Sequence, residues 1–293
     1  MLAQILQLLV GGLATGAIYA LVAIGFTLLW QTSQTINFAQ GEFVMLPAFF
    51  VLIAMGKFGM PFWLAILVAA LISVLLLGAL FKKLLIDPMI RHGVLPMVIA
   101  TIGLAILMKE AVRQFYGADA WPFPALGATA NITIMDVAFD MQSVAILAIC
   151  CAAMVALQLF LAGTRTGRCM QATAQNPDVA RLLGVPVARM ILYTFVTNAV
   201  LVTLASILIT PVYLAKFSNG EWLGLYAFIA AIIGGFNQVR GALVGGLLLG
   251  VIDNFSAVYI SSQYRMAIPL VFLIVIVLVR PQGLLGRVEE RTV

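Results

Sequence analysis

Apolar segments follow one another along almost the whole chain. They cover about residues 5–30, 43–55, 61–86, 94–117, 142–163, 188–214, 223–236, 242–260 and 266–280. A helix that spans a membrane needs about 20 residues, so segments 43–55 and 223–236 are expected to begin or end part-way through the membrane. The pattern predicts an all-α polytopic membrane protein with eight or nine membrane segments, including broken or re-entrant helices.

Two polar, glycine-containing stretches interrupt this pattern. They read "INFAQGEF" at 36–43 and "GGFNQVRG" at 234–241, and each lies beside one of the two short apolar segments. Paired interruptions of this kind are typical of duplicated transporter cores with broken helices near the midplane of the membrane. We therefore predict one transmembrane domain, 1–293, with an internal two-fold repeat: half A at about 1–117, half B at about 142–280, and an external connection, 118–141. Two ordinary tight loops are the alternative.

Composition and charge support a membrane protein and indicate its orientation. The chain of 293 residues is 63% hydrophobic and 9% charged, whereas a soluble domain is about one quarter charged. The loop 163–190 contains four arginines, while 118–164 contains no Lys or Arg. By the positive-inside rule this loop and the tail 281–293 lie in the cytoplasm. The net charge of +5 therefore reflects membrane topology rather than nucleic-acid binding.

The residues needed for several kinds of chemistry are missing from the sequence. His92 is the only histidine, and the three cysteines, Cys150, Cys151 and Cys169, form no ligand pattern. No catalytic residues, metal site or resident cofactor are expected. No G-x-x-x-x-G-K-[ST] stretch exists, so the chain does not bind ATP through a P-loop. Active transport would need an ion gradient or a partner protein.

Charged residues within apolar segments are the usual indicators of function in a membrane protein. Glu42 opens the second apolar segment and Asp253 lies deep in another. Either carboxylate could carry protons or a cation, or be held by backbone amides or a neighbouring helix. Glu110 and Arg113, near the outer end of their segment with Lys109, have the i,i+3 spacing of an ion pair.

Glycines four residues apart recur in the apolar segments. The pairs are Gly12 with Gly16, Gly241 with Gly245, and Gly246 with Gly250. This spacing favours close packing of helices in lipid and says little about chemistry.

The loop between 164 and 190 carries the signals of a short helix. Asn176 is a good N-cap, Pro177 suits the first helical position, and Gly184 is placed to end the helix. The predicted helix, 176–184, has one apolar side made by Val179, Leu182 and Leu183. Such a helix suits docking into a groove of a partner protein. A helix lying on the lipid surface is the alternative.

Four stretches resemble the LivH-type permeases of bacterial ABC importers for branched-chain amino acids. They are "GLATGAIYALVAIGFTLLWQTSQTINFAQGEF", "GRCMQATAQNPDVARLLGV", "AAIIGGFNQVRGALVGGLLLGVIDNF" and "RPQGLLGR". The resemblance implies a subunit of an importer in the bacterial inner membrane. Its partners would be a second, LivM-type permease, two cytoplasmic ATPases that hold ATP and magnesium, and a periplasmic substrate-binding protein.

The resemblance also implies roles for particular residues. It identifies segment 167–184 as the coupling helix that docks on the ATPase. The candidate residues of the pathway or helix break are Asn37, Phe38, Ala39, Gln40, Gly41, Glu42, Gly234, Gly235 and Asn237. Those for coupling, together with the capped helix, are Gly167, Arg168, Ala172, Ala174, Asn176, Asp178, Arg181, Leu182 and Gly184. Glu42 is expected to anchor the break rather than to move protons.

The chain departs from the family pattern near the expected pathway. Tyr226 stands where the family usually has a lysine, Asn237 replaces a glycine, Arg240 replaces a proline, and Gln40 stands where histidine is common. The expected solute is therefore a branched-chain amino acid or a similar small polar organic molecule. Two other readings remain open: an ion-coupled secondary transporter that uses Glu42 or Asp253, and a channel or scaffold subunit without coupling of its own.

Overall fold

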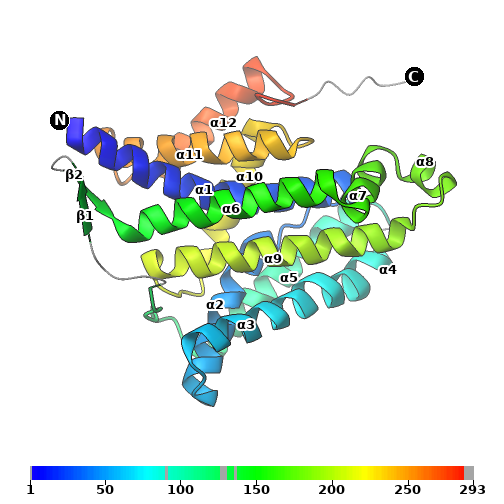
Figure 1. Ribbon diagram of the computed structural model, residues 1–293, viewed down its shortest axis with the longest axis horizontal. Coiled ribbons are helices and arrows are strands. Elements are labelled where there is room, and N and C mark those ends of the chain that lie inside the picture. Colours follow the sequence, from blue (N-terminus) through cyan, green and yellow to red (C-terminus); the bar gives the residue numbers. More distant parts are fainter. Residues whose placement is uncertain (1, 90–91, 126–130, 135–136, 287–293) are drawn as a thin grey trace. The chain divides into compact units, whose positions relative to one another are not determined.

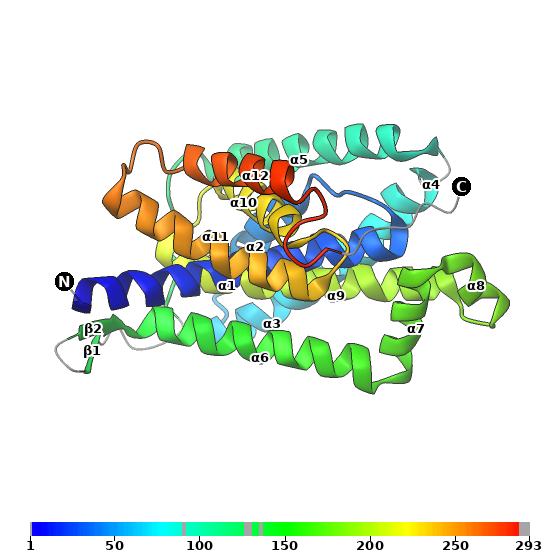
Figure 2. The same ribbon diagram turned by 90° about the horizontal axis from the view of Figure 1, so that it is seen from above.

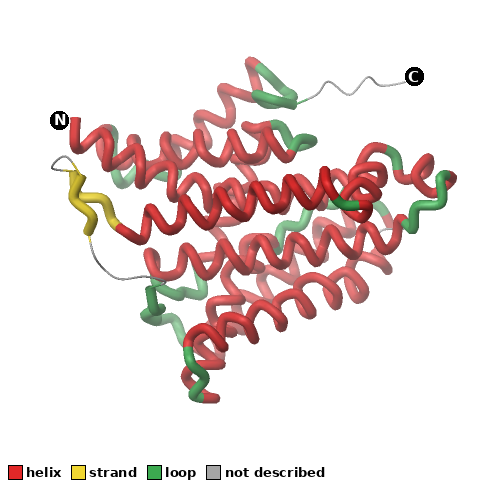
Figure 3. Tube along the Cα trace, in the orientation of Figure 1, coloured by secondary structure: helices red, strands yellow, loops and turns green. Residues whose placement is uncertain are grey.

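The computed structural model describes residues 2–89, 92–125, 131–134 and 137–286, so parts of the predicted connection 118–141 and tail 281–293 lie outside it. Helices form most of this part of the chain (Figures 1 and 3). The elements before residue 120 are α1 (Leu2–Ser33), α2 (Gln40–Phe58), α3 (Phe62–Ser73), the wide-turned π-helices η1 (Val74–Leu80) and η2 (Lys82–Ile86), α4 (Asp87–Met89) and α5 (Val94–Tyr116). After a hairpin of β1 (Asn131–Ile134) and β2 (Val137–Asp140) come α6 (Met141–Gly163), α7 (Arg165–Gln175), α8 (Pro177–Leu182), α9 (Val187–Tyr213), α10 (Asn219–Gly234), α11 (Val239–Tyr259) and α12 (Ala267–Val279).

Every apolar segment predicted from the sequence is helical. Seven helical stretches in the described residues are long and apolar enough to cross a membrane, and α12 is a shorter apolar helix of 13 residues. Helix α2 extends beyond segment 43–55 at both ends and has 19 residues, so it is longer than the apolar segment and long enough to cross a membrane; its start part-way through the membrane stays a prediction. Segment 223–236 does form a short helix, α10, of 16 residues, or about 24 Å. The molecule is an all-α polytopic membrane protein.

The helices gather into two compact units. Unit 1 consists of residues 1–27, 125–152 and 225–293, and unit 2 consists of residues 28–124 and 153–224. The chain passes between the units within α1, α6 and α10. Each unit therefore combines pieces that are far apart in the sequence, and the predicted halves, 1–117 and 142–280, stay a prediction.

In unit 1, helices α1 and α11 cross through their glycines. A Cβ atom added at Gly16 would lie 2.8 Å from the carbonyl oxygen of Gly246, and one added at Gly12 would lie 2.9 Å from Cα of Val251. The backbones are thus in direct contact at the four-residue glycine spacing seen in the sequence. Close approach of this kind supplies the packing that holds helices together in lipid.

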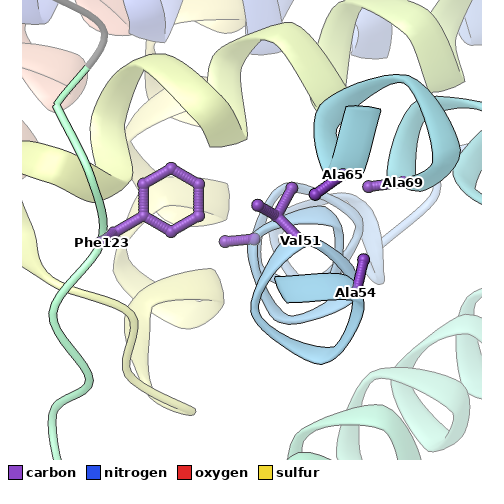
Figure 4. Close-up of a cluster of buried hydrophobic side chains, with 6 residues drawn as sticks. Val51, Ala54, Ala65, Ala69 and Phe123 are labelled. Carbon is purple, nitrogen blue, oxygen red and sulfur yellow. The ribbon is translucent and has the colours of Figure 1, made fainter. Parts of the chain in front are cut away.

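In unit 2, α2 packs on α3 through small side chains. The chain leaves α2 through Gly59 in the left-handed conformation, with φ 62°, and returns as α3. Ala54, Ala65 and Ala69 then lie beside Val51, and Phe123 from the loop after α5 covers one side of the cluster (Figure 4). Alanines allow the two helices to approach closely.

The β-branched stretch after residue 130 forms the only regular strands in the described residues. β1 and β2 pair antiparallel, with Asn131 opposite Asp140 and Ile134 opposite Val137. This hairpin lies in the predicted connection 118–141, and its turn, 135–136, lies outside the described residues.

Candidate translocation and coupling sites

Residues 34–39 form a buried break between α1 and α2. Gln34 has φ 51°, a left-handed conformation that turns the chain out of α1. Asn37 is 1% exposed, and its Oδ1 accepts a hydrogen bond of 3.0 Å from the backbone N–H of Ala39. This bond satisfies a backbone donor at the start of α2. The polar stretch is thus a buried helix break, and residues 40–42 form the first turn of α2.

A pair of amide side chains attaches this break to α9. Gln40 and Asn198 are both fully buried. Gln40 Nε2 donates to Asn198 Oδ1 at 2.6 Å, and Asn198 Nδ2 donates to Gln40 Oε1 at 3.0 Å. Leaving either amide unpaired in this setting would cost about 1–3 kcal/mol. In this conformation Gln40 holds α2 on α9.

Phe38 is the side chain of residues 37–42 that faces outward, with 40% of its surface exposed. Its backbone N–H donates to Thr101 Oγ1 on α5 at 3.3 Å. Thr101 lies about 10 Å along α5, a helix of about 34 Å. The break therefore lies within the length of a spanning helix, and Gln34 and Phe38 are its exposed side chains.

Beside the break, α2 meets α10 at glycines. A Cβ atom at Gly41 would lie 3.0 Å from Cα of Gly224, and the carboxylate of Glu42 packs against Gly220. Glu42 is 4% exposed, and no described residue supplies a hydrogen bond to its Oε2. The carboxylate lies in the first turn of α2 and beside the first turn of α10, where both helix dipoles favour negative charge.

The second interruption, 235–238, is a tight connection between α10 and α11. Gly235 has φ 109°. The chain after α12 covers this connection, because Leu284 N–H donates to the Ile233 carbonyl at 2.8 Å and Leu285 N–H donates to the Gly234 carbonyl at 3.0 Å. These bonds satisfy carbonyls at the end of α10. The predicted residues Gly234 and Gly235 are thus buried in a closed turn.

The two interruptions belong to different units of the fold. Asn37, Gln40 and Glu42 lie in unit 2, whereas Gly234 and Asn237 lie in unit 1. Within unit 2, Gln40 contacts Asn198 of α9, and Glu42 contacts Gly220 of α10. Their roles in a pathway stay predictions.

Asp253 forms a cluster of polar side chains with the turn before α12. Its carboxylate is fully buried and pairs with Arg265, whose Nε lies 2.8 Å from Oδ1 and whose Nη2 lies 2.6 Å from Oδ2. The hydroxyl of Tyr19 donates to Oδ2 at 3.2 Å, and that of Tyr226 donates to Oδ1 at 3.4 Å. Bidentate hydrogen bonds between a guanidinium and a carboxylate are among the strongest hydrogen bonds in proteins. Asp253 is therefore held by neighbouring segments, in line with the second of the two options that the sequence left open.

The loop between α6 and α9 contains two helices, α7 and α8 (Figure 2). Thr164 caps α7, because its Oγ1 accepts from the N–H of Gly167 at 2.9 Å. A Cβ atom at Gly167 would lie 2.6 Å from Cα of Leu161, so glycine permits the sharp turn from α6 into α7. Arg168 and Ala172 lie on α7 rather than on the shorter helix.

The predicted capped helix is α8. Asn176 Oδ1 accepts from the N–H groups of Asp178 and Val179, both at 3.0 Å, and Gly184 has φ 82° after the end of the helix. Arg181 pairs with Asp178 at 3.2 Å across one turn. The cap and the end of this helix are confirmed as predicted.

The apolar side of α8 is exposed. Val179 is 50% exposed, Leu182 is 87% exposed and Leu183 is 77% exposed. Val179 and Leu182 on this six-residue helix, with Leu183 directly after it, present an apolar surface in a basic loop. Clustered exposed apolar side chains mark interaction sites.

Two ion pairs involve residues of α5. Arg113 Nη1 is 3.4 Å from Glu110 Oε2, which confirms the i,i+3 pair predicted from the sequence. Lys109 Nζ lies 2.6 Å from Glu221 Oε2 in the first turn of α10. The second pair joins residues 112 positions apart in the chain.

The sequence interpretation missed several of these partners. Asn198, Arg265 and Glu221 each complete a polar contact that begins at a residue singled out from the sequence. Asn198 is a lone amide in the apolar run of α9, a signal that could have identified it. Arg265 lies in the turn before α12 and Glu221 in the first turn of α10, and neither carried such a signal.

Comparison with known proteins gives matches over nearly the whole chain. The family described as "Branched-chain amino acid transport system / permease component" matches residues 8–278. The permease protein BraD of a high-affinity branched-chain amino acid transport system of Pseudomonas aeruginosa is 32% identical, covering 98% of each chain. The corresponding LivH of Salmonella typhimurium is 31% identical, covering 98% of this chain and 97% of the relative. A probable LivH of Methanocaldococcus jannaschii is 24% identical, covering 96% of this chain and 92% of the relative. No solved structure matches the chain.

Proposed function

Because the chain belongs to the permease family of branched-chain amino acid transport systems, we propose that it forms one half of the membrane pathway of an ATP-driven importer. The chain is a multi-pass protein of the inner membrane and a transporter permease component. The proposed solute is a branched-chain amino acid or a similar small polar organic molecule.

The proposed partners follow from what the chain lacks and what it exposes. Its sequence contains no P-loop, so ATP and magnesium would be held by two cytoplasmic ATPase subunits. A second, LivM-type permease would complete the pathway, and a periplasmic binding protein would deliver the solute. The permease itself then performs no chemical step.

The observation that carries this proposal is the exposed apolar side of α8. Leu182 and Leu183 protrude from a helix that is capped at both ends and held on α9 through α7. A rigid helix with an apolar face suits a groove on a partner protein. An ion-coupled carrier has no need for such a dock.

We propose the following transport cycle. The binding protein releases its solute between the two permeases, and ATP binding moves α8 together with the ATPases. The helix breaks at 34–39 and 235–238 then change the shape of the pathway. Gly167 and Asn176 would transmit the movement, because they fix the turns at either end of α7.

Transport in reconstituted vesicles tests this proposal. The complete complex in proteoliposomes, with its binding protein loaded with L-leucine, should take up the amino acid only when ATP is hydrolysed. An uncoupler should leave the rate unchanged. Uptake that collapses with an uncoupler at constant ATP would contradict the proposal and support ion coupling through Glu42. Binding of valine, isoleucine, urea and small amides to the same binding protein would define the solute class.

A further inference from the structure

Four charged side chains form a mixed-charge group on the surface of unit 2. Lys109, Glu110 and Arg113 come from α5, and Glu221 comes from the first turn of α10. We call this group the charged stripe. Lys109 and Arg113 are one helical turn apart and therefore lie on the same face of α5. The stripe contains two positive and two negative charges and is neutral as a whole.

The stripe lies within the membrane-spanning length of α5. Lys109 is seven residues before the last residue of this helix, Tyr116, which places its Cα about 10 Å from that end. Arg113 lies about 5 Å from it. The ammonium group of Lys109 is bound to Glu221 in the first turn of α10.

The charges stay exposed after they pair. The side chain of Glu221 is 70% exposed, that of Arg113 is 56% exposed and that of Glu110 is 53% exposed. A charged group in contact with hydrocarbon costs several kcal/mol, and such groups in spanning helices face a protein interior or a water-filled cavity. We therefore expect this face to meet water or a partner protein rather than lipid.

We propose that the charged stripe lines the water-filled outer part of the solute route and guides a zwitterionic amino acid along it. The carboxylate of the solute pairs with Lys109 or Arg113, and its ammonium group pairs with Glu221 or Glu110. An ion pair that opens around a zwitterion exchanges two charge contacts for two others, so neither partner loses its counter-charge. The identity of the solute rests on the proposed function, whereas the presence of water at the stripe does not.

The aromatic ring beside the stripe fits the same solute. The guanidinium of Arg113 lies over the ring of Phe217, 5.7 Å from its centroid. The ring supplies an apolar surface next to the charges, which an aliphatic side chain can contact while its zwitterionic end is paired.

Thiol labelling tests whether water reaches the stripe. Cys150, Cys151 and Cys169 are first replaced by alanine, and the complete complex is placed in proteoliposomes. Single cysteines at Lys109 or Arg113 should then react with a charged, membrane-impermeant thiol reagent added from outside. Leu107→Cys is the matched control, because Leu107 is 64% exposed at nearly the same depth but lies on another face of α5. It should react at least 10-fold more slowly.

The labelling result decides between water and the other possible surroundings. If the cysteines at Lys109 and Arg113 react no faster than the control, the stripe is covered by the second permease or by lipid, and the proposal is wrong. Arg113→Cys keeps the test valid if Lys109→Cys does not assemble, since its partner Glu110 is 53% exposed and is not left buried without a counter-charge.

A second measurement tests the guidance of a zwitterion. Leucine-loaded binding protein with ATP should slow labelling at Arg113→Cys several-fold. The double variant Lys109→Met with Glu221→Gln should lower leucine uptake at least 10-fold while ATP hydrolysis and complex assembly are retained. The guidance role is wrong if leucine-loaded binding protein does not slow the labelling of Arg113→Cys and the double variant takes up leucine at the normal rate. Leucine uptake by the unaltered complex is the separate test of the proposed function.

Discussion

Arg265 holds the buried carboxylate of Asp253 with two hydrogen bonds, from Nε at 2.8 Å and from Nη2 at 2.6 Å. This pair joins the interior of α11 to the turn before α12. Asp253 is fully buried, and its two oxygens also accept from Tyr19 and Tyr226. A carboxylate bound in this way is a fixed structural element of unit 1.

Removing the arginine alone should destabilise the protein strongly. Arg265→Met leaves a buried charge without its counter-charge, which costs about 3–5 kcal/mol. The double variant Arg265→Met with Asp253→Leu removes both charges and should recover most of the loss. The apparent unfolding temperature in detergent and the uptake rate measure both effects. A stable double variant that transports nothing would show that this charge pair is needed for transport and is more than a structural element.

Tyr226 offers a second test of the same cluster. LivH-type permeases usually have a lysine at this position, and here the Tyr226 hydroxyl lies 3.4 Å from the Asp253 carboxylate. Tyr226→Lys in the presence of Arg265→Gln should therefore restore a cation beside Asp253. We expect its unfolding temperature to exceed that of Arg265→Gln alone. Tyr226→Phe is the control and should cost about 1 kcal/mol or less.

The amide pair Gln40–Asn198 should behave as a coupled unit. Gln40→Leu or Asn198→Leu leaves one buried amide without its partner, whereas the double variant leaves none. A double-mutant cycle on unfolding should give a coupling energy of about 0.6–1.7 kcal/mol, the range from average to maximum for polar contacts between helices in membranes. Additive effects would contradict the contact between α2 and α9.

Two glycines of α2 should differ sharply in their tolerance of alanine. A Cβ atom at Gly41 would overlap the backbone of α10 at Gly220, whereas one at Gly56 would meet nothing within 4 Å. Gly41→Ala should lower the amount of folded protein in the membrane by more than half. Gly56→Ala should leave that amount unchanged or raise it slightly, because alanine favours the helix. Equal yields would show that α2 and α10 do not touch at Gly41.

The elements that the sequence predicted correctly are those with local signals. Asn176, Pro177 and Gly184 cap and end α8 through contacts within a few residues, and each was identified from its position alone. The start of α2 was not predicted from the sequence, because this helix begins among polar residues whose hydrogen-bond partners lie elsewhere in the chain. Gln40 is helical and buried because Asn198 pairs with it, 158 residues away.

The same distinction holds for the candidate sites. The pairing of Glu110 with Arg113 follows from helix geometry, so the sequence predicted it. The pairing of Lys109 with Glu221 and that of Asp253 with Arg265 depend on the tertiary fold. Periodicity contains no information on which helices are neighbours, so these contacts required the structure.

The central claim is that α8 couples this permease to an ATPase. Leu182 is 87% exposed, so Leu182→Asp should leave folding and membrane insertion intact. Leu182→Met, which keeps an apolar contact, is the matched control. The direct measurement is ATP-driven leucine uptake by complexes that carry each variant, alongside their ATPase activity. We predict that Leu182→Asp lowers uptake at least 10-fold and abolishes stimulation of the ATPase by the binding protein, while Leu182→Met transports normally. Full uptake with Leu182→Asp would contradict the coupling role.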